Sequence, residues 1–197
     1  YEAAEPLLRQ ALEIRQAALG PDHPDLAQSL NNLGLLYESS GEYAHAEEML
    51  QEALRIRRAA LGNDHPDVAQ SLSNLAALYQ TVGNYSAAEE CLRQALETYR
   101  RSLGAEHPYV AQILRDLAAL LNMQGRYDDA EPLLREALAV YSGPLKKRHP
   151  DYTATLDSLA GTCAASGNLP EAEKLYRQVL KQYLRTDDRQ GYVPRTL

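Results

Sequence analysis

The chain has 197 residues, a mass of 21.9 kDa and a formal net charge of −7 at pH 7. Because acidic residues outnumber basic ones by 27 to 20, we expect no general binding of nucleic acid or of anionic membranes, which requires a basic surface. No apolar run approaches the roughly 20 residues of a membrane-spanning helix. The two cysteines, Cys91 and Cys163, form neither a CxxC pair nor a disulfide framework, which favours a reducing, cytoplasmic compartment.

An internal repeat organises the whole sequence, and its step is 42 residues. Three glycines and four His-Pro pairs keep this step: Gly20, Gly62, Gly104, His23-Pro24, His65-Pro66, His107-Pro108 and His149-Pro150. Residues 1–20 align with the second half of a repeat, and four repeats follow at about 21–62, 63–104, 105–146 and 147–184. Because the sequence opens inside this pattern and without Met, we expect it to be a piece of a longer protein.

Each repeat predicts two antiparallel helices. An apolar stripe at helical spacing runs through the first helix of the first repeat: Leu26, Leu30, Leu33 and Tyr37. Pro24 suits the first position of this helix, and Gly41 should end it in a left-handed conformation. The second helix is predicted from about Tyr43 to Leu61. Alanine and leucine dominate the composition and strand-favouring residues are sparse, which also indicates helices.

Two segments depart from the repeat. Ser-Gly-Pro at 142–144 and Lys-Lys-Arg at 146–148 replace the usual residues between the third and fourth repeats, and we expect a locally altered bend there. Residues 185–197 are polar and contain Gly191 and Pro194, which predicts a linker or a frayed tail. The repeat domain is therefore predicted to cover residues 1–184.

The repeat resembles a known family signature. The spacing Leu30-x2-Leu33-Gly34-x2-Tyr37, followed by Ala46-x3-Leu50-x2-Ala53, is similar to that of the tetratricopeptide repeat. That repeat usually has about 34 residues, and the extra length here lies in the second helix and in the Leu-Gly-x-x-His-Pro connection. Ser-Leu-Asn-Asn-Leu at 29–33 and Ala-Leu-Arg-Ile-Arg at 53–57 resemble the long repeats of kinesin light chains. The resemblance implies an all-α, right-handed solenoid of helix-turn-helix repeats.

The periodic histidines are the residues that most suggest metal ligands. A metal site needs ligands that converge within a few ångström, whereas these histidines recur one repeat apart along a solenoid. A proline follows each of them, so we interpret them as loop residues that set the entry into each first helix. No compact cluster of Cys, His and Asp appears in the sequence. We therefore expect no metal and no cofactor.

Motifs of catalysis are missing from the sequence. It contains no GxxxxGK[ST] phosphate loop, no GxSxG and no HExxH. Carboxylate pairs such as Glu47-Glu48 recur on the second helices, which is typical of a solvated face. We interpret Cys163 as a small buried residue and Cys91 as an inert thiol. The sequence therefore predicts a protein that is not an enzyme.

Polar residues beside the leucine stripe of the first helices form the candidate site. Stacked helix pairs form a superhelix, and its concave wall is lined mainly by first helices. The residues expected on this wall come from three repeats: Gln28, Asn31, Asn32, Leu35, Gln70, Ser73, Asn74, Gln112, Arg115 and Asp116. An amide side chain donates and accepts at once, so it can hold an extended peptide backbone without reading its side chains.

The resemblance to kinesin light chains adds roles for four residues. It implies that Asn32 and Asn74 hold the backbone of a bound peptide, and that Arg15 and Arg57 receive its acidic side chains. The later repeats depart from this pattern: Asp116 and Ser158 occupy the asparagine position, and Tyr99 and Tyr141 occupy the arginine position. A preference for acidic peptides is therefore in doubt for the C-terminal half.

Two functions from different classes remain open. The first is a non-enzymatic adaptor or scaffold that binds an extended segment of a protein partner in the concave groove. The alternative is a structural spacer or self-association module of a larger signalling protein. The alternative draws on the terminal helices, whose apolar faces could meet another copy of the chain.

Overall fold

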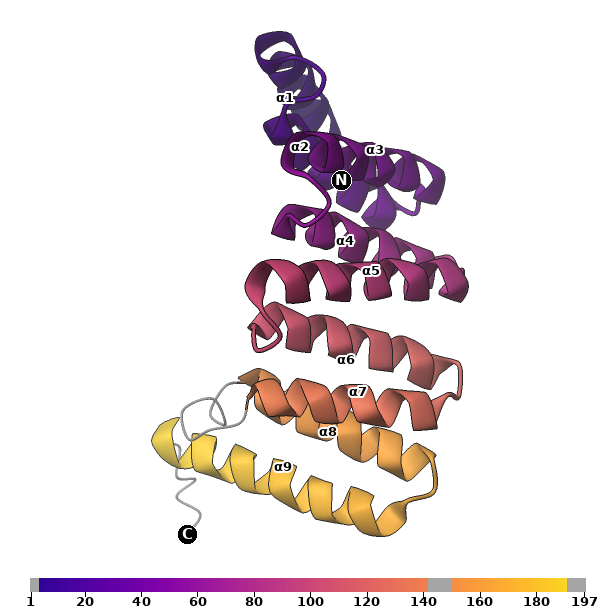
Figure 1. Cartoon of the computed structure of the whole chain (residues 1–197), viewed down its shortest axis with the longest axis vertical. Coiled ribbons are helices and arrows are strands. Elements are labelled where there is room, and N and C mark those ends of the chain that lie inside the picture. The colour runs from indigo at the N-terminus through magenta and orange to yellow at the C-terminus, as the bar shows by residue number, and fades with distance from the viewer. Residues whose placement is uncertain (1–3, 142–149, 191–197) are drawn as a thin grey trace, which may run out of the picture. The chain divides into compact units, whose positions relative to one another are not determined.

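The structure is a computed structural model that describes residues 4–141 and 150–190, and side chains within 5–141 and 151–184. Within these residues it contains only helices and no strand (Figure 1). The nine helices are α1 (Ala4–Leu19), α2 (Pro24–Ser40), α3 (Tyr43–Leu61), α4 (Pro66–Thr81), α5 (Tyr85–Leu103), α6 (Pro108–Met123), α7 (Tyr127–Val140), α8 (Pro150–Ala165) and α9 (Leu169–Gln190). The predicted all-α helical repeat solenoid is confirmed.

The chain separates into two compact units, residues 1–113 and 114–197, and the boundary falls inside α6. In the first unit each helix from α1 to α4 contacts the next one along the chain, and α2 also contacts α4. In the second unit α8 contacts both α7 and α9. Helix pairs therefore stack through neighbours in sequence, as expected of a repeat protein.

The helix bounds of the first repeat match the prediction. Helix α2 begins at Pro24 and ends at Ser40, and α3 runs from Tyr43 to Leu61. Gly41 ends α2 with a φ of 83°, and its N–H donates to the carbonyl oxygen of Glu38 at 3.1 Å. This left-handed backbone conformation is available to glycine at no steric cost.

Three histidines before first helices, His23, His65 and His107, are N-caps, and His149 lies outside the described residues. The Nδ1 atoms of His23 and His65 each accept a hydrogen bond, at 3.2 Å, from the backbone N–H two residues further along. His107 makes the same bond to the N–H of Tyr109. The bond satisfies one of the donors that a helix start leaves without an intrahelical partner. The interpretation of these histidines as loop residues at the helix entry thereby gains a specific physical cause.

We expect His65→Ala to lower the free energy of unfolding by about 1 kcal/mol, because the cap of α4 is lost. His65→Asn should retain most of the stability, since asparagine is a preferred N-cap. Denaturant unfolding followed by circular dichroism measures both values. Equal losses in the two variants would contradict the capping role.

The core of the first unit consists of leucines packed beside alanines. Ile56 and Ala53 of α3 pack with Leu26 and Leu30 of α2 in a buried cluster. Helices α2 and α3 come especially close at Gly34, where an added Cβ would lie 2.7 Å from the Cγ atom of Leu50. Small residues therefore set how closely the two helices of a repeat approach.

The second unit has a core of the same kind. Leu117, Leu121, Leu134 and Leu159 are almost fully buried. Cys163 is fully buried among them, as the sequence interpretation proposed, and burial raises the pKa of its thiol. Asn122 adds a polar contact between α6 and α8, because its Nδ2 donates to Oγ1 of Thr162 at 2.8 Å.

Two predictions concern the C-terminal part of the chain. The altered bend expected at 142–148 lies outside the described residues. Helix α9 continues to Gln190, so the backbone at 185–190 is helical, and the linker or frayed tail at 185–197 stays a prediction. The apolar spacing of α9 gave no signal beyond Leu184, because Arg185 and the residues after it are polar. No helix in the described part of the chain is long and apolar enough to span a membrane.

Candidate functional site

Most of the predicted site residues of the first unit lie on neighbouring first helices. Helix α2 carries Gln28, Asn32 and Leu35 with exposed side chains, and α4 carries Gln70 exposed and Asn74 half-buried. We call the surface of α2 and α4 that bears these five residues the first-helix face. Ser73 is half-buried beside it, with its hydroxyl donating to the carbonyl oxygen of Ala69 at 2.9 Å. Gln112 on α6 is exposed.

Five amide side chains of α2 and α4 form two hydrogen-bonded groups, a pair and a group of three, which together we call the amide cluster: Gln28 and Asn32, and Asn31, Gln70 and Asn74. Gln28 Nε2 donates to Asn32 Oδ1 at 2.9 Å, and Gln70 Nε2 donates to Asn74 Oδ1 at 3.1 Å. Asn74 Nδ2 donates to Asn31 Oδ1 at 2.6 Å, which connects α4 to α2. Asn74 thus contacts Asn31, the sequence neighbour of Asn32, and not Asn32 itself, which lies one repeat before it.

Asn31 and Arg57 are both buried, although the sequence predicted that they line the peptide-binding groove. The side chain of Arg57 is 4% exposed. Its guanidinium donates to Ser71 Oγ at 2.8 Å, to the carbonyl oxygen of Asp67 at 3.1 Å and to Gln28 Oε1 at 2.9 Å. Burial lowers the pKa of this guanidinium, while the nearby Asp67 opposes that shift. Arg57 therefore joins α3 to α2 and α4 and is not presented to the carboxylate of a ligand.

Arg15 makes a similar contact one repeat earlier but stays exposed. Its guanidinium donates to the hydroxyl of Ser29, fourteen residues further along, as Arg57 does to Ser71. Because α1 leaves the Arg15 side chain open to solvent, this arginine can still meet an acidic group. The contact explains why serine follows at the same distance in both repeats.

The tyrosine that replaces this arginine in the third repeat is also buried. Tyr99 stacks against Tyr109, with ring centroids 5.3 Å apart. Burial raises the pKa of Tyr99 to about 12. Ile113, which is almost fully buried, stands where the two earlier repeats have serine. Two buried side chains, a tyrosine and an isoleucine, therefore stand where the earlier repeats have arginine and serine.

The second unit holds the last two predicted site residues. Arg115 is half-buried and forms an ion pair with Asp151, with Nη1 and Oδ1 3.3 Å apart. Asp116 is half-buried as well, and burial raises the pKa of its carboxyl group although the neighbouring Arg115 opposes the shift. Tyr141, at the arginine position of this repeat, is buried, and its hydroxyl lies 3.5 Å from Asp151 Oδ2.

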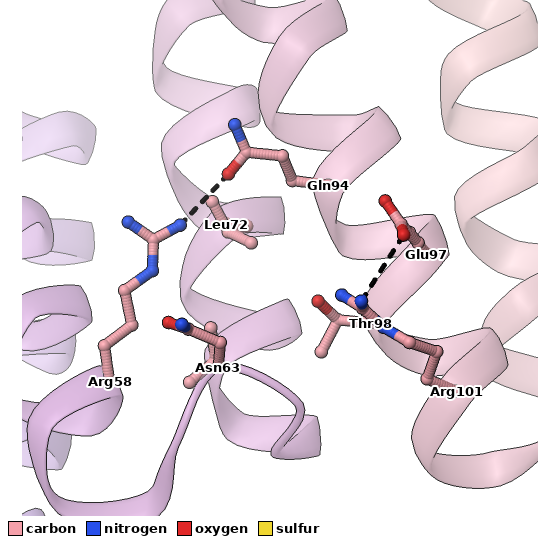
Figure 2. Close-up of a pocket in the computed structure, with 8 residues that line it drawn as sticks. Arg58, Asn63, Leu72, Gln94, Glu97, Thr98 and Arg101 are labelled. Atoms are coloured by element: carbon pink, nitrogen blue, oxygen red, sulfur yellow. Dashed lines mark hydrogen bonds and ion pairs between the residues drawn. The ribbon is translucent and has the colours of Figure 1, made fainter.

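The described residues also contain a hollow that the sequence did not predict. It has a volume of about 370 Å³ and lies between α3, α4 and α5. Figure 2 shows Arg58 reaching from α3 to Gln94 on α5 at one side of it, with Nη2 and Oε1 3.0 Å apart. On α5, Arg101 is paired with Glu97 at 3.4 Å and with Asp64 at 3.1 Å. The lining is thus mainly polar, and the positive charge of Arg101 is paired with the carboxylates of Glu97 and Asp64.

Nothing in the described residues forms a metal or catalytic centre. No group of three or more His, Cys, Asp or Glu side chains there could hold a metal ion. Cys91 is half-buried, and burial raises the pKa of its thiol to about 11, so little reactive thiolate is present at neutral pH. The absence of a metal, a cofactor and an activity in the whole chain stays a prediction.

Models of one protein family match the sequence along nearly its whole length. One tetratricopeptide repeat model matches residues 1–59, 46–101 and 67–143, and another matches residues 121–190. Comparison with the curated proteins gives no match.

Several solved structures are similar to this chain. A putative kinesin light chain with nearly identical TPR-like repeats from Podosopora anserina is 29% identical, with a TM-score of 0.81 over 94% of this chain and 88% of that one. BtubC (BKLC) from P. vanneervenii is 26% identical, with a TM-score of 0.84 over 100% of this chain and 77% of that one. The apo form of RapI, at 19% identity, a TM-score of 0.75 and coverage of 91% and 64%, shares the fold.

These matches agree with the repeat spacing, the helix pairs and the small residues between them. The long connection that carries the capping histidines fits the kinesin light chain-like type, which the sequence also predicted. The chain belongs to the tetratricopeptide repeat family.

Proposed function

We propose that this chain is a protein-interaction scaffold that binds an extended peptide segment on the first-helix face. The observation that carries the proposal is the amide cluster, which extends over α2 and α4 and includes the exposed side chains of Gln28, Asn32 and Gln70. Amide groups can donate to peptide carbonyl oxygens and accept from peptide N–H groups. Recognition of the backbone would leave room for different side chains in the partner.

The charge around the first-helix face supports a limited preference for acidic peptides. Arg15 is exposed and can attract a carboxylate, whereas Arg57 is buried and cannot reach one. The proposed acidic preference therefore rests on Arg15, near the N-terminal end of the first unit. Replacing Arg15 should weaken the binding of an acidic peptide most at low salt, because salt screens exposed charges.

The proposed function needs no cofactor and no chemical step. The partner is a protein or peptide in extended conformation, and nucleic acid and membranes are not among the proposed partners. A cytoplasmic location is proposed with it, since Cys91 and Cys163 are both free thiols in the structure.

The test uses a peptide selected from a random library displayed on phage against the wild-type chain and then synthesised. The double variant Asn32→Ala, Asn74→Ala should weaken binding of this peptide by about 1–3 kcal/mol, the usual net value of one to three hydrogen bonds. Titration calorimetry measures the change.

Controls separate binding from folding in this test. Gln16→Ala, on an exposed site of α1 away from the amide cluster, should leave the affinity unchanged. Because Asn74 also bonds to Asn31, a thermal melt must show that the double variant is folded at the temperature of the titration. Equal affinities of the folded double variant and the wild type would exclude the first-helix face as the binding site.

A second candidate function is self-association, and it is favoured by an exposed apolar surface on α1. Leu7 and Ile14 are 67% and 61% exposed, whereas Ile56, which occupies the place of Ile14 one repeat later, is fully buried against α2. Exposed contiguous apolar surface marks interaction sites. On α9, described by itself, Leu180, Tyr183 and Leu184 are exposed as well.

Self-association through α1 predicts a mass that rises with concentration in light scattering. The double variant Leu7→Glu, Ile14→Glu should remain a monomer over the same concentrations, because burying two carboxylates in an interface is unfavourable. A wild-type chain that is monomeric at all concentrations would rule out this function.

A further inference from the structure

We propose that Arg57, acting through Gln28, fixes the side chain of Asn32 so that its NH₂ group faces the ligand, which makes Asn32 a recogniser of peptide carbonyl oxygens. The inference rests on the proposed peptide-binding function and assigns the polarity of one contact within it. In this arrangement Arg57 is a positioning residue, because it is buried and acts through Gln28.

The first step is the bond between Arg57 and Gln28. Arg57 Nη2 lies 2.9 Å from Gln28 Oε1, and an arginine side chain can only donate hydrogen bonds. Gln28 must therefore turn its oxygen to Arg57, and its NH₂ group points away from Arg57. Bonds from Nη1 to Ser71 and to the backbone of Asp67 hold the guanidinium in place.

The second step is the bond between Gln28 and Asn32. Gln28 Nε2 donates to Asn32 Oδ1 at 2.9 Å, so the oxygen of Asn32 is turned toward Gln28 on its own helix and its NH₂ group is turned away from it. Within the described residues, no group accepts a hydrogen bond from Asn32 Nδ2, and the side chain is exposed. The group that Asn32 turns away from Gln28, and with which it can meet a ligand, is consequently its NH₂ donor.

The next repeat lacks the cation that fixes this direction. Tyr99 stands in the place of Arg57, and the chain of bonds from Gln70 through Asn74 to Asn31 contains only amides. If all three amides turned over, both bonds would persist with donor and acceptor exchanged. Gln70, at the end of this chain of bonds, can therefore present either its oxygen or its NH₂ group, whereas the amide of Asn32 has a fixed direction.

An extended peptide presents carbonyl oxygens and N–H groups in alternation along each edge. A fixed donor at Asn32 accepts only the registers that place a carbonyl oxygen there. The reversible amides of the second repeat then adapt to whichever group follows. Arg57 thus determines the register of the bound segment without touching it.

The deciding variant is Gln28→Glu, tested first in the free protein. A carboxylate accepts from Arg57 and cannot donate, so Asn32 must turn over and donate Nδ2 to the new carboxylate. We expect exchange of the Asn32 side-chain NH₂ protons with water, measured by ¹⁵N NMR, to slow by about fivefold, the effect of one net hydrogen bond. Gln70→Glu adds the same charge where no cation is present and should leave this exchange rate unchanged.

The same variants are then titrated with the selected peptide. Gln28→Glu should weaken binding by about tenfold and Asn32→Ala by a similar factor. Gln94→Glu, which adds the same charge at an exposed site on α5 outside the first-helix face, should change affinity by less than about threefold. Gln28→Met, which removes the bond to Asn32 without adding charge, should give an intermediate loss and serves if Gln28→Glu does not fold.

The outcomes separate this inference from the proposed function. If Asn32→Ala binds the peptide as well as the wild type does, the proposed binding site is wrong. If Asn32→Ala weakens binding but Gln28→Glu and Gln28→Met do not, the proposal that Arg57 orients Asn32 through Gln28 is overturned, while the binding site stands. If the Asn32 NH₂ protons exchange at the same rate in the wild type and in Gln28→Glu, Gln28 does not orient Asn32 in the free protein, and the proposal is overturned.

Discussion

Replacing Arg57 by tyrosine should lower the free energy of unfolding by about 3 kcal/mol, because buried hydrogen-bonding groups lose their partner. The guanidinium satisfies Ser71 Oγ and the carbonyl oxygen of Asp67, and Gln28 Oε1 accepts its third bond. A tyrosine ring at this position would face these polar groups without matching their hydrogen bonds. Urea unfolding, followed by circular dichroism, measures the loss.

The third repeat indicates how the loss can be recovered. There Tyr99 coexists with Ile113, and both are buried. Adding Ser71→Ile to Arg57→Tyr should therefore restore about 1–2 kcal/mol relative to the sum of the single changes, a coupling typical of residues in contact. Ser71→Ile alone should destabilise, because it overpacks a fully buried site and removes an acceptor of Arg57.

A neighbouring arginine provides the control for this double-mutant cycle. Arg58 is exposed and donates to Gln94, so Arg58→Tyr should change stability by less than about 0.5 kcal/mol. Strictly additive effects of Arg57→Tyr and Ser71→Ile would show that the two side chains do not act as a pair. The contact described for Arg57 would then not explain the exchange of residues between repeats.

Sequence periodicity was sufficient to predict the helices of the first repeat. Proline, glycine and the leucine stripe each report a local property of the backbone, and the observed ends of α2 and α3 agree with them. The histidines were correctly placed at helix entries, but the sequence did not show that Nδ1 accepts a hydrogen bond. That bond depends on the extended backbone at His23, where φ is −76° and ψ is 136°.

Periodicity was not sufficient to predict that the side chain of Arg57 is buried. A helical position next to the apolar stripe can be buried or exposed, because a long arginine side chain reaches across several ångström. The sequence did contain a signal, because two positions fourteen residues apart change together from repeat to repeat. Arginine is followed by serine in two repeats, and tyrosine is followed by isoleucine or threonine in the others. Reading the two positions together would have indicated a contact between them.

The amide cluster shows a second limit of sequence reasoning. Asn32 and Asn74 were predicted as equivalent residues, one repeat apart. In the structure each asparagine accepts a hydrogen bond from the glutamine four residues earlier, and Asn74 also donates to Asn31 of the preceding repeat. Repeat symmetry predicts the bond that the two asparagines share, but it did not indicate the contact between Asn74 and the preceding repeat.

The second large effect on stability is expected at the small residues between helices. Ala46 is fully buried, and its carbonyl oxygen lies only 3.3 Å from the position that a Cβ at Gly34 would occupy. Ala88 holds the same place one repeat later and is also fully buried. The helices of a pair therefore leave no room at this position for a larger side chain.

Ala88→Leu should consequently lower the free energy of unfolding by about 1–3 kcal/mol, because the added atoms push α5 away from its neighbours or into strained rotamers. Guanidinium unfolding measures the loss, and a steady m-value would show that the change lies in stability and not in cooperativity. Ala60→Leu, at an exposed site near the end of α3, adds the same atoms where space is open and should cost less than about 0.5 kcal/mol. If both variants unfold at the wild-type denaturant concentration, Ala88 is not a point of close helix contact, and the tight approach seen at Gly34 is confined to the first repeat.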